Sequence, residues 1–302
     1  MKILLQFPEG LKQHAFEFAK KYTKQGDEVF FSASPCYGGC DIALEEAKAV
    51  GAKKIIHFGH ARFVKKKLSI PVEYVPYELE FDIRSLESIL QTLEPYKKIA
   101  IGTTIQYSHK IKEIKKFFES NGKIVFVGRG TMAIEDGQIL GCDAFAVTQF
   151  EKECEIILFI GDGQFHYLAI DSNKPVFVFH PKSKQLKNIN GEIEMVRKRR
   201  RGAILKALEC KTFGIIVSTK PGQSNPEAAK WAKKELEKRK KTVALLVANE
   251  IEPLALNNFL VFDCYVTTAC PRIAEDREEF TKPVLDMKML SEVLELMDEL
   301  KK

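Results

Sequence analysis

The sequence lacks any continuous run of about 18 apolar residues, the shortest stretch that usually spans a membrane as a helix. We therefore expect no transmembrane helix, and the N-terminus turns polar too soon for a secretory signal. It has no zinc-finger spacing, phosphate-binding glycine loop or aromatic RNA-binding signature. The net charge of +6 in 302 residues is compatible with an acidic or nucleic-acid partner but does not require one.

Cysteine is present, but not in the pattern of a small disulfide-rich domain. The count of seven is odd, and the spacings are long and irregular. With no secretory signal expected, these features predict a cytoplasmic protein that carries thiols. Such thiols are more often inert core residues than ligands, so each one has to be judged by its neighbours.

Short apolar runs alternate with amphipathic segments along the whole chain. This pattern is typical of parallel strands covered by helices on both faces, so the predicted fold class is α/β. This alternation of strands and helices occurs in three stretches of similar length. We therefore expect three similar domains over residues 1–94, 95–208 and 209–302. One large doubly wound sheet is the alternative. The expected strands cover residues 2–7, 29–31, 54–59, 71–76, 98–102, 123–128, 144–147, 156–160, 175–179, 213–218, 243–247 and 261–266.

Polar residues before apolar segments predict where helices begin. Asp41, Ser108 and Asn225 each carry an oxygen that can accept a hydrogen bond from a first helical turn, and Pro226 suits the turn after Asn225. In parallel sheets, binding sites form in the loops at the carboxyl ends of the strands. Side chains in those loops are therefore the first candidates for function.

Three cysteines lie in such loops, one in each expected domain. Cys40, Cys142 and Cys270 each have glycine or proline beside them. Small neighbours let backbone N–H groups approach the sulfurs of a metal cluster. Three thiolates would hold an iron–sulfur cluster and leave one iron open for chemistry. On spacing alone, three unrelated buried cysteines are the alternative.

The other four cysteines have different surroundings. Cys264 lies within an apolar strand, Cys154 among glutamates that disfavour a thiolate, and Cys210 near the end of a helix. We expect these three to be structural or exposed. Cys36 makes a C-x-x-x-C pair with Cys40, but the third cysteine of the radical S-adenosylmethionine signature is missing. Cys36 is therefore a bystander or a group beside the cluster.

Six short motifs are spread over the three expected domains. They are YGGCD (37–41), IHFGH (56–60), GQILGC (137–142), IGDGQFH (160–166), STKPGQ (218–223) and TACPRIA (268–274). In content and order they resemble the archaeal enzymes of diphthamide biosynthesis, the 3-amino-3-carboxypropyl transferases that start diphthamide formation. The resemblance covers nearly the whole chain.

The resemblance implies a fold, a cofactor and a reaction. It implies three similar α/β domains in pseudo-threefold arrangement around a central [4Fe-4S] cluster held by Cys40, Cys142 and Cys270. The reduced cluster would split the Cγ–S bond of S-adenosylmethionine, as in an unusual radical enzyme. Methylthioadenosine would leave, and a 3-amino-3-carboxypropyl radical would add to C2 of a histidine on translation elongation factor 2. The family also implies a homodimer and an unidentified electron donor, with no membrane partner.

Further residues are candidates for binding S-adenosylmethionine. Arg272 suits the methionyl carboxylate, with a salt bridge inside its own loop as the alternative. The turn Gly161-Asp162-Gly163 suits close approach of the nucleoside, or is a plain tight turn. Gly222 and Gln223 precede a helix and offer N–H groups to an anion or to the cluster, or only help to cap the helix.

The roles of two other groups of residues, three histidines and a basic run, stay open. His57, His60 and His166 receive no catalytic role, because a strand-end histidine is either a general base or only a satisfied polar residue. The basic run Arg197–Arg201 is a solvated helix face, or it docks an acidic face of the elongation factor or nucleic acid carried with it.

Two rival functions are considered. Quinolinate synthase is another three-domain enzyme with three cysteine ligands, but its motifs do not match those quoted above. The rival from another class is a non-catalytic iron–sulfur electron-transfer protein or a metal-stabilised structural protein. An open iron that binds S-adenosylmethionine would exclude that rival.

Overall fold

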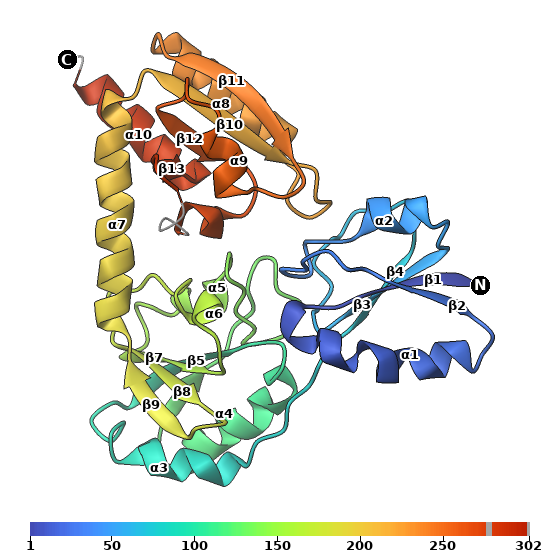
Figure 1. Ribbon diagram of the computed structural model, residues 1–302. Helices are drawn as coiled ribbons and strands as arrows, with labels where there is room; N and C mark the ends of the chain where they lie inside the picture. The colour runs from blue at the N-terminus through green and yellow to red at the C-terminus, as the bar shows by residue number, and fades with distance from the viewer. Residues whose placement is uncertain (276–279, 301–302) are drawn as a thin grey trace. The chain divides into compact units, whose positions relative to one another are not determined.

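The computed structural model describes residues 1–275 and 280–300 and shows an α/β protein with three separate sheets (Figure 1). The chain divides into two compact units, Met1–Ile193 and Glu194–Lys302. The first unit holds two of the sheets, and the second unit holds the third. The alternative of one large doubly wound sheet is therefore wrong. The division into three domains stays a prediction.

The elements follow one another in the order that the apolar runs predict. The strands are β1 (Lys2–Gln6), β2 (Glu28–Phe31), β3 (Lys54–Phe58), β4 (Val72–Val75), β5 (Lys98–Thr103), β6 (Ile124–Phe126), β7 (Ile156–Ile160), β8 (Val176–His180), β9 (Gln185–Asn188), β10 (Thr212–Ser218), β11 (Thr242–Ala248), β12 (Cys264–Thr267) and β13 (Val284–Leu285). The α-helices are α1 (Ala15–Thr23), α2 (Leu44–Ala49), α3 (Glu87–Leu90), α4 (Ile111–Ser120), α5 (Phe145–Thr148), α6 (Gln164–Tyr167), α7 (Asn190–Glu209), α8 (Pro226–Lys238), α9 (Pro253–Asn257) and α10 (Met287–Glu299). Short 3₁₀ helices are η1 (Glu9–His14), η2 (Ile83–Leu86), η3 (Ser108–Lys110) and η4 (Pro271–Glu275).

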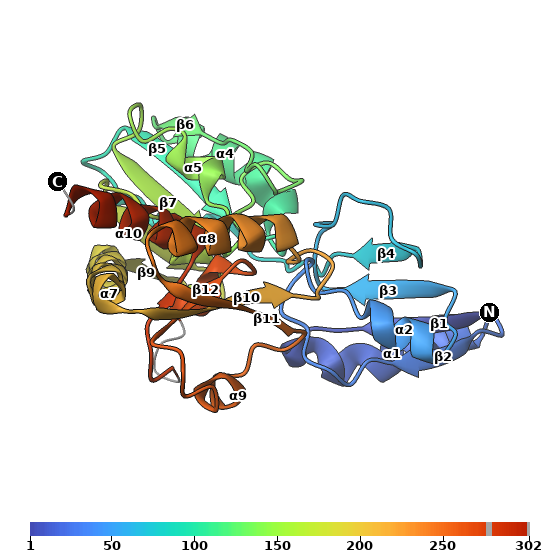
Figure 2. The same ribbon diagram turned by 90° about the horizontal axis from the view of Figure 1, so that it is seen from above.

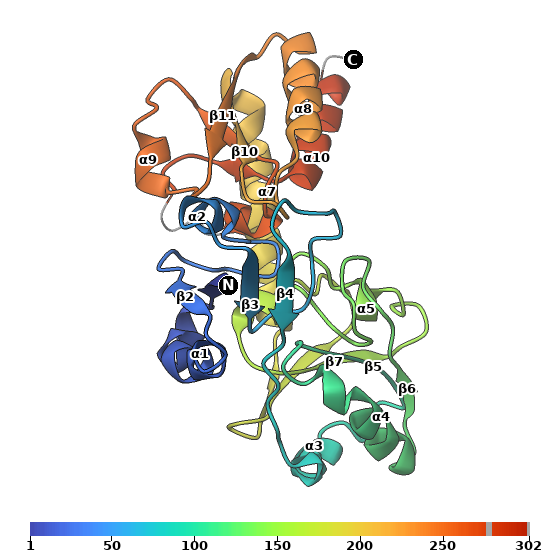
Figure 3. The ribbon, with the colours of Figure 1, turned by 90° about the vertical axis from the view of Figure 1, so that its right-hand side faces the viewer.

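The first sheet has the strand order β2-β1-β3-β4, with all strands parallel. Successive residues of a strand point to opposite faces. Ile3 and Leu5 therefore pack with α1, whereas Leu4 packs with Ile55 and α2. Figure 3 shows α1 and α2 on opposite sides of this sheet. Burial on both faces explains why its central strands are continuous apolar runs.

The second sheet has the strand order β6-β5-β7-β8-β9. Helices α3 and α4 cover one face, where Ile99, Ile101 and Phe118 meet. Helices α5 and α6 lie on the other face, against Ala100 and Phe159. Strand β9 runs antiparallel to β8, because it returns directly from β8 through a short turn. This edge strand departs from the expectation of purely parallel sheets.

The third sheet has the strand order β11-β10-β12-β13 and is parallel. Helices α8 and α10 run side by side on one of its faces (Figure 2). The expected face of α8, made of Ala229, Ala232 and Leu236, is buried. Asn225 Oδ1 accepts a hydrogen bond from Ala228 N at 3.1 Å, so the predicted start of this helix is confirmed.

Three local predictions are wrong. Residues 144–147 form part of a short helix, not a strand, because Asp143 Oδ1 accepts a hydrogen bond from Phe145 N at 3.0 Å and starts a helical turn. Asp41 does not cap α2, since its carboxylate accepts from Tyr37 N in its own loop. Ser108 lies inside a 3₁₀ turn before α4 and makes no cap.

No helix among residues 1–275 and 280–300 is both long and apolar enough to cross a membrane. Helix α7 is the longest, but it carries the basic run and is strongly polar. This agrees with the expectation from the sequence.

Candidate functional site

The cysteines separate into two classes by burial. Cys36, Cys154, Cys210 and Cys264 are buried, Cys40 and Cys270 are partly exposed, and Cys142 is exposed. The three cysteines with access to solvent are the three that the sequence predicts as ligands. Burial raises the pKa of the Cys154 thiol, and nearby Glu151 and Glu153 act in the same direction, so that thiol is inert. The prediction that Cys264 is structural agrees with its full burial in the third core.

Cys40 lies in the loop between β2 and α2, and tight backbone packing fixes that loop. A Cβ atom at Gly39 would lie 2.5 Å from the carbonyl oxygen of Ala61 and 3.6 Å from the Cβ of His60. The Tyr74 hydroxyl donates a hydrogen bond to the Gly39 carbonyl at 3.1 Å. Glycine is therefore needed beside Cys40 so that its loop can rest on the segment after β3.

Cys142 lies in a tight turn that its neighbour Asp143 holds in place. The Asp143 carboxylate accepts hydrogen bonds from Met132 N at 2.6 Å, from Thr131 Oγ1 at 3.1 Å and from Phe145 N at 3.0 Å. A carboxylate that accepts several hydrogen bonds fixes the backbone around it. The thiol next to it is therefore presented from a rigid turn.

The Cys142 loop packs against Phe165, whose neighbour His166 acts electrostatically on His60 beside the Cys40 loop. A Cβ atom at Gly141 would lie 2.1 Å from the Phe165 ring, so this ring covers the glycine beside Cys142. His166 follows Phe165 and is close enough to His60 to affect its titration. Burial, and secondly the charge of His166, lower the pKa of His60 to about 4. His60 also packs beside Gly39, the residue next to Cys40.

Cys270 follows β12 directly in the second unit, and η4 begins at the next residue. The Arg272 guanidinium forms an ion pair with Glu275, and Arg200 Nη2 lies 2.6 Å from the same carboxylate. Arg272 is only 8% exposed. The salt bridge that was the alternative for Arg272 is thus present, while its binding of a substrate carboxylate stays a prediction.

The turn Gly161-Asp162-Gly163 follows β7 at the carboxyl edge of the second sheet. Gly161 has φ 155° and Gly163 has φ 88°, both in the region that favours glycine. Asp162 accepts a hydrogen bond from the Tyr107 hydroxyl at 2.9 Å and lies 3.4 Å from His180 Nδ1. Burial, together with Asp162, raises the pKa of Tyr107. These contacts fix the carboxylate, and its binding of the nucleoside stays a prediction.

Gly222 and Gln223 lie in the turn between β10 and α8. Gln223 N donates to the Lys220 carbonyl at 3.0 Å. The Lys220 side chain, only 5% exposed, pairs with Glu250 at 2.8 Å. Asn225 supplies the helix cap, so the backbone of the turn is not needed for that purpose. Contact of Gly222 and Gln223 with an anion or a cluster stays a prediction.

The basic run lies on α7, and ion pairs hold several of its members. Arg200 pairs with Glu275, and Arg201 Nη1 lies 2.8 Å from Glu292. Lys198 and Arg199 are exposed. The run is therefore partly structural, and its docking role is limited to the residues that point into solvent.

Two sets of contacts were not predicted. The carboxylate of Glu275 forms ion pairs with two arginines, Arg200 and Arg272. The only feature of the sequence that could have predicted these pairs is the position of Glu275 three residues after Arg272. Cys36, His57 and His60 lie together, although no role was predicted for the histidines. The recurrence of histidine at i and i+3 across Gly59 was the available signal.

A family model described as putative diphthamide synthesis protein matches residues 7–299. The 2-(3-amino-3-carboxypropyl)histidine synthase of Pyrococcus horikoshii is 38% identical over 99% of this chain and 87% of its own length. The synthase of the same name from Methanocaldococcus jannaschii is 31% identical over 94% of this chain and 81% of its own. The crystal structure of Dph2 from Pyrococcus horikoshii with a 4Fe-4S cluster superposes with a TM-score of 0.88 at 37% identity, covering 98% of this chain and 86% of that one.

These similarities confirm the family that the six motifs suggest. The close structural match also confirms the α/β fold with three parallel-sheet regions. The curated relatives are named as synthases, which is the kind of enzyme that the motifs predict.

Proposed function

The chain belongs to the family of diphthamide synthesis proteins, and from this premise we propose that it transfers a 3-amino-3-carboxypropyl group from S-adenosylmethionine to a histidine. The histidine belongs to translation elongation factor 2, and the transfer is the first step of diphthamide formation. The observation that carries the proposal is the solvent access of Cys40, Cys142 and Cys270, when the other four cysteines are buried.

The residues present fit a [4Fe-4S] cluster. Cysteine thiolates are the usual ligands of such clusters. Cys270 lies shortly after β12, and Cys40 and Cys142 lie in the longer loops that follow β2 and β6; each loop is fixed by hydrogen bonds, ion pairs or close packing. The 4Fe-4S cluster in the crystal structure of Dph2 from Pyrococcus horikoshii supports the same cofactor here. Three protein ligands leave one iron for the substrate.

When bound, the cluster would supply the electron that cleaves the Cγ–S bond, so that methylthioadenosine leaves and a 3-amino-3-carboxypropyl radical adds to imidazole C2; the adduct would then return one electron to the oxidised cluster and lose the C2 proton. The chain's own residues position the reactants for this step. Arg272 binds the methionyl carboxylate from a site where its guanidinium is already oriented by Glu275. The turn Gly161-Asp162-Gly163 lets the nucleoside approach the backbone closely. Gly222 and Gln223 would lie at the cluster edge, with the Gly222 N–H and the Gln223 side-chain amide as the candidate donors, because Gln223 N already donates to the Lys220 carbonyl.

The partners follow from the same proposal. Elongation factor 2 is the protein substrate, a homodimer is the functional form, and a cytoplasmic electron donor reduces the cluster. The exposed Lys198 and Arg199 on α7 are candidates for contact with an acidic face of the factor. The rival function, a non-catalytic iron–sulfur or metal-stabilised protein, needs no such substrates.

The test is a product analysis under anaerobic conditions. Cluster-loaded protein is incubated with dithionite, S-adenosylmethionine and elongation factor 2. The proposal expects methylthioadenosine and a factor whose histidine has gained the 3-amino-3-carboxypropyl group, both read by mass spectrometry. Formation of 5′-deoxyadenosine instead would indicate ordinary radical cleavage. Absence of any cleavage would support the non-catalytic rival.

A further inference from the structure

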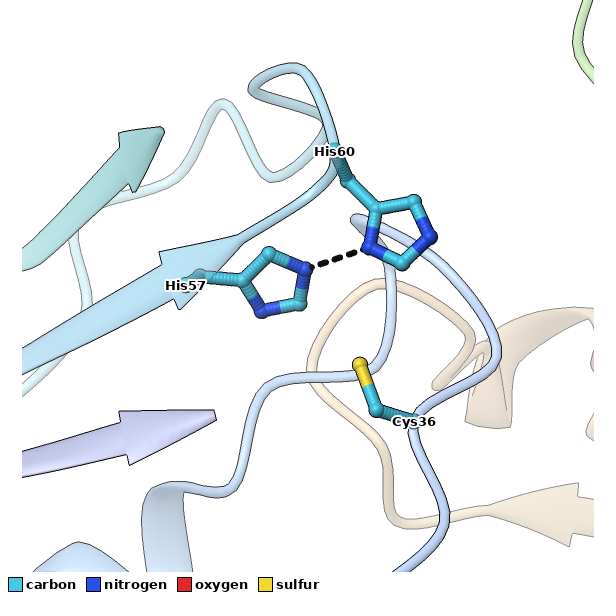
Figure 4. A group of neighbouring side chains, drawn as sticks. All are labelled: Cys36, His57 and His60. Carbon is cyan, nitrogen blue, oxygen red and sulfur yellow. Dashed lines mark hydrogen bonds between the residues drawn. The ribbon is translucent and has the colours of Figure 1, made fainter. Parts of the chain in front are cut away.

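We propose that Cys36, His57 and His60 form a second metal site, separate from the three cluster cysteines, that binds one zinc-like divalent cation. Their ligand atoms all lie within 4.8 Å of one another. Figure 4 shows the Cys36 sulfur pointing toward the two imidazole rings. The inference rests on this geometry and does not depend on the proposed reaction.

The fold brings the three side chains together at one edge of the first sheet. His57 is in β3, beside Gln6 of the central strand β1. Cys36 lies in the loop that follows β2. Gly59 has φ 89°, and a Cβ there would lie 2.9 Å from the Pro8 ring, so only glycine makes this turn without strain. The turn brings His60 back over His57, and their rings are hydrogen-bonded at 2.9 Å (Figure 4).

A hydrogen-bond network fixes which nitrogen of His57 carries the proton. Gln6 Nε2 donates to the Asp41 carbonyl at 2.8 Å, and Gln6 Oε1 accepts from Ala43 N at 3.1 Å. The backbone thus sets the orientation of the amide. Its Oε1 lies 3.0 Å from His57 Nδ1, which must therefore be the protonated donor. The lone pair of His57 is consequently on Nε2, the atom that faces His60.

This arrangement is the one that metal-binding histidines use. Such a histidine donates its other N–H to a protein oxygen, which fixes the ring and raises its basicity. Without a metal, His60 Nδ1 donates to His57 Nε2. With a metal, His60 adopts the other tautomer, and both nitrogens direct lone pairs at the ion. Metal binding therefore needs a change of tautomer at His60, loss of the Cys36 proton and a small separation of the two rings.

The two histidine nitrogens are spaced nearly as a small tetrahedral ion needs, and the Cys36 sulfur lies within 4.8 Å of them. Zinc binds histidine nitrogen at about 2.0–2.1 Å and thiolate sulfur at about 2.3 Å, so tetrahedral ligand atoms lie about 3.3–3.6 Å apart. The two nitrogens, now 2.9 Å apart, need to separate by only about 0.4 Å for such a site. A fourth ligand completes the tetrahedron, and water is sufficient for that position.

The local environment favours neutral imidazoles, which are the form that binds metal. Burial, and secondly the neighbouring His60, lower the pKa of His57 well below its usual value. Cys36 is 4% exposed and His57 is fully buried, whereas His60 is partly exposed and gives the ion a route of entry. Binding releases one proton from the Cys36 thiol. The bound ion would join the Cys36–Cys40 loop to the end of β3.

The experiment uses cluster-loaded full-length protein. One equivalent of zinc is added, unbound metal is removed, and zinc and iron per chain are measured by mass spectrometry. Zinc-edge X-ray absorption then gives the ligands of zinc alone, without interference from the iron. We expect about one zinc per chain, with one sulfur and two imidazole nitrogens as protein ligands. No retained zinc, or zinc bound mainly by sulfur, would overturn the proposal.

Variants separate this site from the cluster. Cys36→Ala and His60→Gln each remove a proposed ligand and should weaken zinc binding by about 100-fold or more. Gln6→Met removes only the hydrogen-bond partner of His57 and should weaken zinc binding by about 10–100-fold, the usual cost of losing such a partner. Iron content should be unchanged in all three. The matched controls are Cys154→Ala, a buried cysteine of the same unit, and His109→Gln. Circular dichroism confirms folding. Undiminished zinc affinity in Cys36→Ala and His60→Gln would mean that the two histidines are only a hydrogen-bonded pair.

Discussion

The Cys142 loop and the Cys270 loop present their thiols by different means. Beside Cys142, one carboxylate, Asp143, accepts three hydrogen bonds from its own loop. After Cys270, the corresponding carboxylate is Glu275, and it binds two guanidiniums instead. A cysteine loop is therefore held by hydrogen bonds to one carboxylate in the first unit and by ion pairs to another carboxylate in the second unit.

This difference explains why the three regions share a plan but no sequence repeat. A loop fixed by backbone hydrogen bonds needs an acidic residue directly after the cysteine. A loop fixed by ion pairs needs residues that are far apart in sequence, such as Arg200 and Glu275. The two units also differ in titratable groups, because all six histidines of the chain fall in Met1–Ile193.

The largest effect is expected for the cysteines themselves. Cys40→Ala, Cys142→Ala and Cys270→Ala should each lose most cluster iron and lower activity by more than about 100-fold, since removal of even an outer partner costs 10–100-fold. Iron analysis after anaerobic reconstitution measures this. The buried controls are Cys154→Ala in the first unit and Cys264→Ala in the second. If all three variants kept their iron, the proposed role of the three cysteine loops as cluster ligands would be wrong.

Acid should destabilise the first unit more than the second. In metal-free protein His60 has a pKa of about 4, below its unfolded value near 6.5, so the unfolded chain binds more protons between these pH values. The free energy of unfolding is therefore unaffected by the titration of His60 above about pH 6.5. It falls as the pH drops from there to about 4, by about 3 kcal/mol in total. Hydrogen exchange measured for each unit tests this, and His60→Gln should flatten the profile. A larger acid effect in the second unit would contradict it.

Removal of the Asp143 carboxylate tests the loop held by backbone hydrogen bonds. Asp143→Ala removes the acceptor of three partly buried donors. The free energy of unfolding should fall by about 2–3 kcal/mol, because hydrogen bonds to a charged acceptor contribute about 1.5–3 kcal/mol each and part is regained from water. Denaturant unfolding measures it. Asp136→Ala, which removes an exposed partner of Arg129, is the control.

Neutralising Glu275 tests the loop held by ion pairs. Glu275→Gln should lower the free energy of unfolding by about 2 kcal/mol, because two largely buried arginines lose their counter-charge. The control is the exposed ion pair between Arg201 and Glu292. Glu292→Gln should change the free energy of unfolding by less than about 1 kcal/mol. Equal losses in the two variants would show that Glu275 is an ordinary surface partner.

The smallest effect on stability is expected from the solvent-facing part of α7. The double variant Lys198→Ala, Arg199→Ala should leave unfolding within about 0.5 kcal/mol of the parent. If this surface docks the elongation factor, KM for the factor should rise, most clearly at low salt. An unchanged KM would restrict the basic run to its structural ion pairs.

The order of strands could be predicted because apolar runs record burial on both faces. The contexts of the cysteines also agreed with their burial, since the accessible thiols were the ones with glycine or proline beside them in loops after strands. Residues 144–147 were misassigned because the apolar run is short, and a side-chain hydrogen bond from Asp143 decided the conformation. Strand β9 and the Cys36–His57–His60 group depend on contacts between distant segments. No local pattern encodes such contacts.

The central claim is that the three accessible cysteines hold one cluster and leave one iron for S-adenosylmethionine. Mössbauer spectroscopy of protein reconstituted with isotope-enriched iron, recorded with and without S-adenosylmethionine, tests it most directly. The account predicts that about one quarter of the iron signal, one site of a [4Fe-4S] cluster, changes on addition of the substrate. An unchanged spectrum at saturating substrate would contradict it.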